Sequence, residues 1–203
     1  SYAFSATGIT NSSSNGTYYA RINTYTNSDC TTGATDSRVV AFVIADSRVS
    51  VTATVDPTLT FALSTTTCAL GTLSASATSS CQYTITSGTN AMYGANITIQ
   101  GLTSLANSAS STVTIADVAE SPGTITAGTE GYGVYLTAGS GWTEAGDFND
   151  DATPVPTSAA SILTSSGSVA SAASTIRHEA AISATTEAGD YSQTVEYIIT
   201  ATF

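Results

Sequence analysis

The sequence is poor in charge and contains no lysine at all. Its 203 residues include four basic side chains, all arginine, and 15 acidic ones, which gives a formal net charge of −11. Charged residues make up 9% of the chain, whereas an ordinary soluble domain has about 25%. Phosphate binding needs clustered lysine and arginine, so this composition argues against a nucleic-acid-binding protein and against attachment to anionic lipid.

Long hydrophobic runs are also missing. No stretch of about 18 consecutive apolar residues occurs, so we expect no membrane insertion. No basic segment followed by an apolar one opens the chain, which favours a processed product of secretion. Low charge combined with 41% hydrophobic residues is not a disordered composition. Serine and threonine, rather than charged residues, are expected on the solvent-exposed faces. This suits β-strands in a protein outside the cell or at its surface.

Residues suited to catalysis are scarce as well. The single histidine, His178, has the same strand parity as Ile176, which favours a packed side chain over a general base. No G-x-S-x-G motif is present, and a catalytic triad cannot be drawn. Zinc catalysis needs clustered histidine and cysteine. A secreted hydrolase would have to use a carboxylate pair from Glu130, Glu144 and Asp147. We therefore expect that the protein is not an enzyme.

Only three cysteines occur, at positions 30, 68 and 81. In a secreted protein the pair Cys68 and Cys81 favours a disulfide, with two buried thiols as the alternative. Such a bond would close a loop of about a dozen residues and contribute about 3 kcal/mol to stability. Cys30 is then left either free or bonded to another subunit.

What the sequence does contain is repeated alternation of apolar and polar residues with a period of two. It is clearest at residues 191–203, where Ile198 is the one apolar residue on the polar face. A second long strand is predicted over residues 49–63, bent or at a sheet edge because of Pro57. The stretch 158–174 is read as loop with a short strand at Ile162 and Leu163. Further short strands are predicted at residues 81–85, 93–99, 113–115, 132–136 and 176–184.

Turns containing glycine, proline and serine separate these strands at short intervals. The pattern predicts an all-β protein, an antiparallel β-sandwich of immunoglobulin-like or jelly-roll type. Residues 49–203 are expected to form this main sandwich.

Residues 1–48 differ from the rest and are predicted to form an N-terminal β arm. Two strands are expected in SYAFSAT and TYYARINTY, followed by the apolar run VVAFVIA at residues 39–45. A continuous apolar run indicates burial on both faces, and two or three strands are marginal alone. The arm is therefore expected to pack on the sandwich, on residues upstream, or on another subunit.

The strand pattern resembles that of secreted bacterial β-sandwich proteins. The resemblance lies in VSVTATVDPTLTFALS, in the cysteine-flanked CALGTLSASATSSC and in the ending AGDYSQTVEYIITATF. The ending is also loosely similar to spore-coat-U and archaic chaperone–usher pilin domains, although a cysteine early in the first long strand is lacking. The resemblance implies filaments in which each subunit donates a strand to its neighbour.

Three other site predictions follow from local motifs. One motif has oxygen-bearing side chains at every second position, Asp147, Asn149 and Asp151. This spacing predicts a calcium site, and a solvated acidic turn is the alternative. Asn-x-Ser/Thr motifs make Asn11, Asn15 and Asn96 possible glycosylation sites. An aromatic platform for sugars is the alternative to core packing for Trp142, Tyr132, Tyr135 and Phe148.

The leading functional hypothesis is a structural subunit of an extracellular, pilus-like filament or surface layer. Copies of the chain would form a homopolymer, joined head to tail by β-strand donation from residues 1–48. The predicted donor side chains are Tyr2, Phe4, Val39, Val40, Phe42 and Ile44. The alternative is a monomeric surface adhesin or carbohydrate-binding module. No cofactor is predicted apart from the possible calcium ion.

Overall fold

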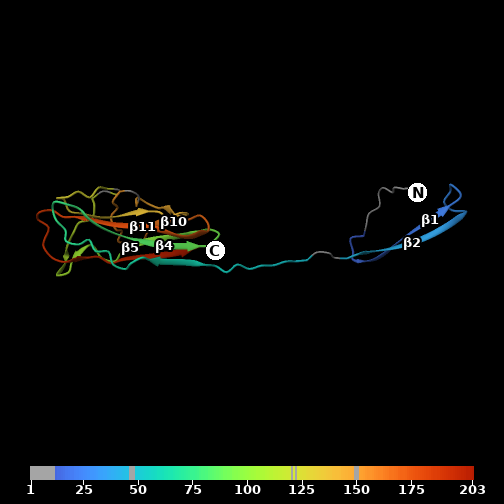
Figure 1. The fold of residues 1–203 in the computed structure, drawn as a ribbon, viewed down its shortest axis with the longest axis horizontal. Coiled ribbons are helices and arrows are strands. Elements are labelled where there is room, and N and C mark those ends of the chain that lie inside the picture. Colours follow the sequence, from blue (N-terminus) through green and yellow to red (C-terminus); the bar gives the residue numbers. More distant parts are fainter. Residues whose placement is uncertain (1–11, 46–48, 120, 122, 149–150) are drawn as a thin grey trace. The chain divides into compact units, whose positions relative to one another are not determined.

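The computed structural model describes residues 12–45, 49–119, 121, 123–148 and 151–203. The described residues form strands and turns without a helix, which confirms the predicted all-β class. They include no helix long and apolar enough to cross a membrane. The chain divides into two compact units, residues 1–54 and 55–203. Figure 1 shows a hairpin in the first unit and layered sheets in the second.

The second unit is an antiparallel β-sandwich with a small third sheet. One sheet has the order β3-β4-β11-β8, and the other has the order β13-β5-β10-β9. The third sheet has the order β12-β6-β7. The described strands of the second unit are β3 (Leu59–Leu63), β4 (Ser79–Thr89), β5 (Ala95–Gly101), β6 (Ala106–Asn107), β7 (Ser110–Thr114), β8 (Gly131–Thr137), β9 (Thr143–Glu144), β10 (Ala160–Thr164), β11 (Val169–Ala181), β12 (Tyr191–Ser192) and β13 (Val195–Ala201).

The core of the sandwich comes from inward-facing residues of both sheets. Ile85 on β4 and Ile176 on β11 meet Ile97 and Ile99 on β5, and each side chain is at most 1% exposed. Burying an aliphatic side chain of this size contributes about 1.5–3 kcal/mol relative to leaving it exposed. Alternating apolar residues in the sequence therefore specify the two facing sheets.

Two predicted strand boundaries are wrong. The strand predicted over residues 49–63 is reduced to β3, because no described strand pairs with residues 49–58. In contrast, β11 begins at Val169, inside the stretch that was predicted to be mostly loop. There β4 supplies a partner for small residues such as Ala172 and Ala173. In both cases the presence or absence of a neighbouring strand decides where the strand begins, and the alternation of residues does not reveal that neighbour.

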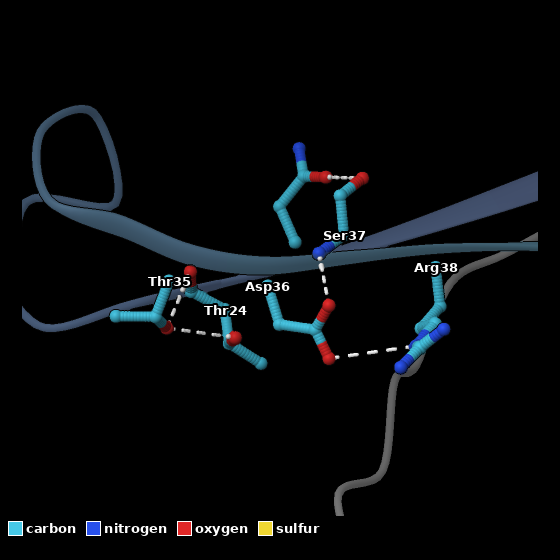
Figure 2. Close-up of polar contacts among 6 residues, drawn as sticks. Thr24, Thr35, Asp36, Ser37 and Arg38 are labelled. Atoms are coloured by element: carbon cyan, nitrogen blue, oxygen red, sulfur yellow. Dashed lines mark hydrogen bonds and ion pairs between the residues drawn. The ribbon is translucent and has the colours of Figure 1, made fainter.

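The first unit contains one described hairpin, β1 (Gly16–Tyr25) and β2 (Ala34–Ile44), paired in antiparallel register. Its half nearest the turn is polar, as Figure 2 shows: the Thr35 hydroxyl donates to the Thr24 carbonyl oxygen at 3.2 Å, and Asp36 pairs with Arg38 at 3.5 Å. In the other half Tyr18 stacks on Phe42, with 5.9 Å between ring centroids. The hairpin is therefore polar at one end and apolar at the other.

Burial of the apolar run on both faces, which the sequence predicts, does not occur within the described chain. Between residues 12 and 45 no side chain is buried. Val39, Val40 and Val43 are 52%, 55% and 68% exposed. The reason is that, among the described strands, β2 pairs only with β1, in a two-stranded sheet.

Candidate functional site

The sandwich is open along one side, where β3 and β13 are the edge strands of its two sheets. Among the described residues, no strand pairs with the outer edge of either one. Their inward side chains are only half-buried, although they pack against the core. These side chains are Phe61 and Leu63 on β3 and Val195, Tyr197, Ile199 and Ala201 on β13. We call the space between the two edges the β3/β13 groove.

The opposite edge of the first sheet is closed. The Val118 amide donates to the Tyr132 carbonyl oxygen at 2.8 Å, and Val134 exchanges backbone hydrogen bonds of 2.9 and 3.0 Å with Thr153. As a result, Tyr132, Val134 and Leu136 on the edge strand β8 are no more than 3% exposed. Exposed sheet edges are ordinarily covered or charged, so the open β3/β13 side differs from the covered edge at β8.

A pocket of about 770 Å³ opens at one end of the β3/β13 groove. Leu63 and Tyr83 line it from the first sheet, and Val195 and Tyr197 line it from the second. The loop that follows β3 forms another wall. That loop is tied back by the Cys68–Cys81 disulfide, which the structure confirms, with 5.5 Å between the two Cα atoms. The disulfide thus holds one wall of the pocket to β4.

A chain of hydrogen bonds crosses the inner end of this pocket. Tyr132 Oη lies 2.7 Å from the Gln193 side-chain oxygen and 2.8 Å from His178 Nδ1. Tyr83 Oη lies 3.0 Å from His178 Nε2 and 2.5 Å from Tyr197 Oη. Because an amide oxygen only accepts, Tyr132 donates to Gln193 and must accept the proton of Nδ1. With a neutral imidazole, Tyr83 donates to Nε2 and Tyr197 donates to Tyr83.

The imidazole in this arrangement is neutral. Burial lowers the pKa of His178 to about 4, because the charged form would be desolvated. Burial likewise raises the pKa of Tyr83, Tyr132 and Tyr197. All four groups are therefore uncharged at neutral pH, and the chain joins β8, β11 and β4 to β13 without burying a charge. This geometry agrees with the interpretation of His178 as a packed side chain.

Residues 49–55 form a second unpartnered feature. Val49, Val51 and Val55 are 84%, 88% and 82% exposed, the highest values among the large hydrophobic residues. Ser50, Thr52 and Thr54 alternate with them in the sequence. The segment thus retains the alternation of a half-buried strand but pairs with no strand among the described residues.

The chain is held where this segment leads into the sandwich. The Asn90 side chain accepts a hydrogen bond from the Thr58 amide at 2.7 Å and donates one to the Asp56 carbonyl oxygen at 2.8 Å. The Asn90 amide also donates to the Thr58 carbonyl oxygen at 3.3 Å. These contacts bind residues 56–58 to the turn between β4 and β5, at the end of the sandwich.

Of the predicted donor side chains, Tyr2 and Phe4 lie outside the described residues. Val39, Val40 and Phe42 are exposed on β2, and Ile44 is half-buried. Register places Val40, Phe42 and Ile44 on one face of the hairpin with Tyr18, and places Val39 on the other face. The hairpin therefore presents apolar side chains on both faces.

The aromatic residues that could form a sugar platform are mostly core residues. Trp142, Tyr132 and Phe148 are 6%, 3% and 5% exposed, and the Trp142 indole N–H donates to the Ser87 carbonyl oxygen at 3.5 Å. Tyr135 is half-buried, with the Arg177 guanidinium 3.6 Å from its ring centroid. Their flat faces are covered by the protein itself.

The predicted calcium ligands are only partly described, since Asn149 lies outside the described residues. Asp147 accepts a hydrogen bond from Ser121 at 3.4 Å, and Asp151 is exposed. Among the described residues, no three His, Cys, Asp or Glu side chains are grouped to share a metal ion. The calcium site stays a prediction.

The glycosylation motifs differ in accessibility. Asn11 lies outside the described residues, and Asn15 is exposed beside β1. Asn96 is half-buried on β5 and accepts a hydrogen bond from the Ser161 hydroxyl. Exposure favours Asn15 as the acceptor, and modification of any of the three stays a prediction.

No protein-family model and no curated protein matches this sequence. Sequence reasoning missed both the β3/β13 groove and the tyrosine–histidine chain. The alternation along their strands places His178, Tyr83 and Tyr197 on the faces that point into the core. This was the one indication in the sequence that these side chains could meet. Their meeting depends on which strands are neighbours.

Proposed function

We propose that this protein is a structural subunit of an extracellular filament or surface layer, in which copies of the chain assemble by adding β-strands to one another. The observation that carries the proposal is the β1–β2 hairpin, which exposes apolar side chains on both faces and buries none of them. A two-stranded sheet is marginal in water, so this hairpin needs further packing partners. Strand addition supplies backbone hydrogen bonds for affinity and alternate side chains for register.

Head-to-tail contact between different surfaces of successive copies generates an open fibre when the rotation does not close. The low charge density of the chain suits close packing of copies despite the net charge of −11. The disulfide fits an oxidising, extracellular setting. These features are in keeping with an extracellular assembly of copies.

The test is negative-stain electron microscopy and size-exclusion chromatography of the purified chain and of a Val40→Asp, Phe42→Asp variant. Both side chains are exposed on β2, so the substitutions leave the sandwich intact. We expect filaments or large oligomers from the wild-type chain and much weaker assembly from the variant. Thr35→Asp, on the polar half of the hairpin, is the matched control. A wild-type chain that stays monomeric at high concentration would refute the proposal.

One observation favours a second candidate, a monomeric adhesin or carbohydrate-binding module. The pocket of about 770 Å³ falls within the usual range of ligand pockets, about 300–1,000 Å³. Binding of soluble glycans by a monomeric chain, lost on substitution of Tyr197 at the pocket wall, would favour this candidate over assembly.

A further inference from the structure

The two unpartnered features of the chain are complementary. The β3/β13 groove lacks a strand between two sheet edges, and residues 49–55 form a strand-like segment without a sheet. We propose that residues 49–55 of one copy fill the β3/β13 groove of a second copy as an added β-strand. This inference rests on the proposed function of self-assembly, and it names the donor segment and the acceptor.

The lengths and spacings of donor and acceptor agree. The donor has seven residues, and so does β13. Val49, Val51, Ala53 and Val55 recur every second residue, as do the half-buried Val195, Tyr197, Ile199 and Ala201 of β13. Side chains of a strand point alternately to its two faces, so the donor would place four apolar side chains over the exposed core. Its serine and threonine side chains would face solvent.

The edges of the groove carry no feature that prevents pairing. β3 has no charged residue, and β13 has one, Glu196, on its solvent face. Ile198, beside it, is 50% exposed. Proteins commonly protect free edges with charges, prolines or bulges. The donor is also uncharged over residues 49–55, so it places no second carboxylate beside Glu196.

The hydrogen bonds of Asn90 favour pairing between copies over pairing within one copy. To enter the groove of its own sandwich, the segment would have to reverse direction at residues 56–58, immediately before β3. Those residues are bound to the β4–β5 turn through the Asp56 carbonyl, the Thr58 amide and the Thr58 carbonyl. A reversal there would break these hydrogen bonds, whereas insertion into a second copy leaves them intact.

The segment 49–55 is a better donor than β2, which was predicted from the sequence. The backbone of β2 already pairs with β1 over the whole length of the hairpin. Donation of β2 into a groove with two edges would require that pairing to be broken. Residues 49–55 have no such pairing to lose, and their valines are more exposed than those of β2.

A disulfide-trapping experiment tests the pairing and its register. Thr52 is the middle residue of the donor, and Ile198 is the middle residue of β13. Both are expected on the solvent face, and they would be opposite each other whether the strands run parallel or antiparallel. The Cα atoms of such a pair lie about 4.5–5.5 Å apart, within reach of a disulfide. The full-length chain carrying Cys30→Ser, Thr52→Cys and Ile198→Cys would be oxidised mildly and examined on non-reducing gels.

We expect a ladder of covalent oligomers from this variant and none from a control in which Thr112→Cys, on β7 away from the groove, replaces Ile198→Cys. An intramolecular crosslink that gives only compact monomer would overturn the inference, because the segment would then fill its own groove. Absence of any crosslink in chains that still form filaments would also overturn it.

A second pair of variants uses the two faces of the donor. Val51→Asp would place a carboxylate in the groove, whereas Thr52→Asp would place it in solvent. We expect Val51→Asp to raise the concentration needed for assembly at least about tenfold, and Thr52→Asp to change it by less than about twofold. Both side chains are exposed in the single chain, so the melting temperature of the sandwich should be the same in both variants.

Equal assembly by the two variants would refute the donor assignment and leave self-assembly through the hairpin standing. A wild-type chain that never assembles would instead refute the proposed function itself.

Discussion

The Nδ1 atom of His178 lies 2.8 Å from the hydroxyl oxygen of Tyr132, in the interior of the sandwich. Tyr132 itself donates to Gln193, so this contact requires a proton on Nδ1 and leaves Nε2 to accept from Tyr83. Protonation of Nε2 would make Tyr83 the acceptor of that hydrogen bond and turn its hydroxyl proton toward Tyr197. Both forms of the ring can therefore make these hydrogen bonds, and the protonated form is disfavoured because its charge would be buried.

Stability should therefore fall with pH in the range where an unfolded histidine gains its proton. The pKa of His178 is lowered from 6.5 to about 4 in the folded state, so the unfolded chain binds more protons between these values. The resulting stability is complete above about pH 6.5 and is lost as the pH falls toward 4. Between pH 7 and pH 5 we expect a loss of about 2 kcal/mol from this group alone.

Urea denaturation of the wild-type chain and of His178→Gln at several pH values measures this contribution. The carboxylates titrate in both proteins, so the difference between the two curves isolates the histidine. The variant is expected to be less stable than the wild-type chain at pH 7, and its free energy of unfolding is expected to change less with pH. Parallel curves over this range would contradict a neutral, buried His178.

Removal of the disulfide should destabilise the sandwich and loosen the wall of the pocket. Cys68 and Cys81 are 13 residues apart in the sequence, and a closed loop of this size contributes about 3 kcal/mol in the chain-entropy model. The Cys68→Ser, Cys81→Ser variant is expected to lose about that amount in urea denaturation. Cys30→Ser is the control and should leave stability unchanged, because Cys30 is exposed and free. A loss below about 1 kcal/mol would mean that the loop is held by its other contacts.

Two glycines with similar backbone conformations should respond differently to alanine. Gly94 has φ of +77°, and a Cβ there would lie 1.9 Å from the Ser165 carbonyl oxygen. Gly71 has φ of +71°, with no atom within 4 Å of such a Cβ. Gly71→Ala therefore carries only the cost of the left-handed conformation, about 1–2 kcal/mol.

Gly94→Ala adds a backbone clash between the β4–β5 turn and the end of β10, and we expect a loss of more than about 3 kcal/mol. Thermal unfolding of both variants, compared with the wild-type chain, measures the difference. Equal shifts in melting temperature would show that the turn moves away from Ser165 without cost.

The strands with apolar residues on one face were predictable, because every second side chain is apolar and all of these side chains point into the core. Residues 195–201 alternate as predicted, with Ile198 on the exposed face as the exception. The Cys68–Cys81 disulfide, which the sequence favoured over two buried thiols, is confirmed. Phe203 was expected to continue the inward face but is 55% exposed, because β13 ends at Ala201.

The candidate site was less predictable, because it depends on neighbours rather than on patterns. Residues 49–55 have the same alternation as residues 195–201, yet only the latter have a strand beside them. Similarly, nothing in the local sequence of His178 indicates that Tyr83 and Tyr132 lie on either side of its ring. Strand order places the two tyrosines there.

The sequence by itself determined the all-β class and the low charge of this protein, since these follow from composition and from the two-residue period of a strand, and it favoured the disulfide. Only the tertiary structure decided which edges of the sandwich are covered and which stay open. The physical reason is that backbone hydrogen bonding is the same for every residue type except proline, so the sequence shows which segments can form strands but not which strands lack a partner.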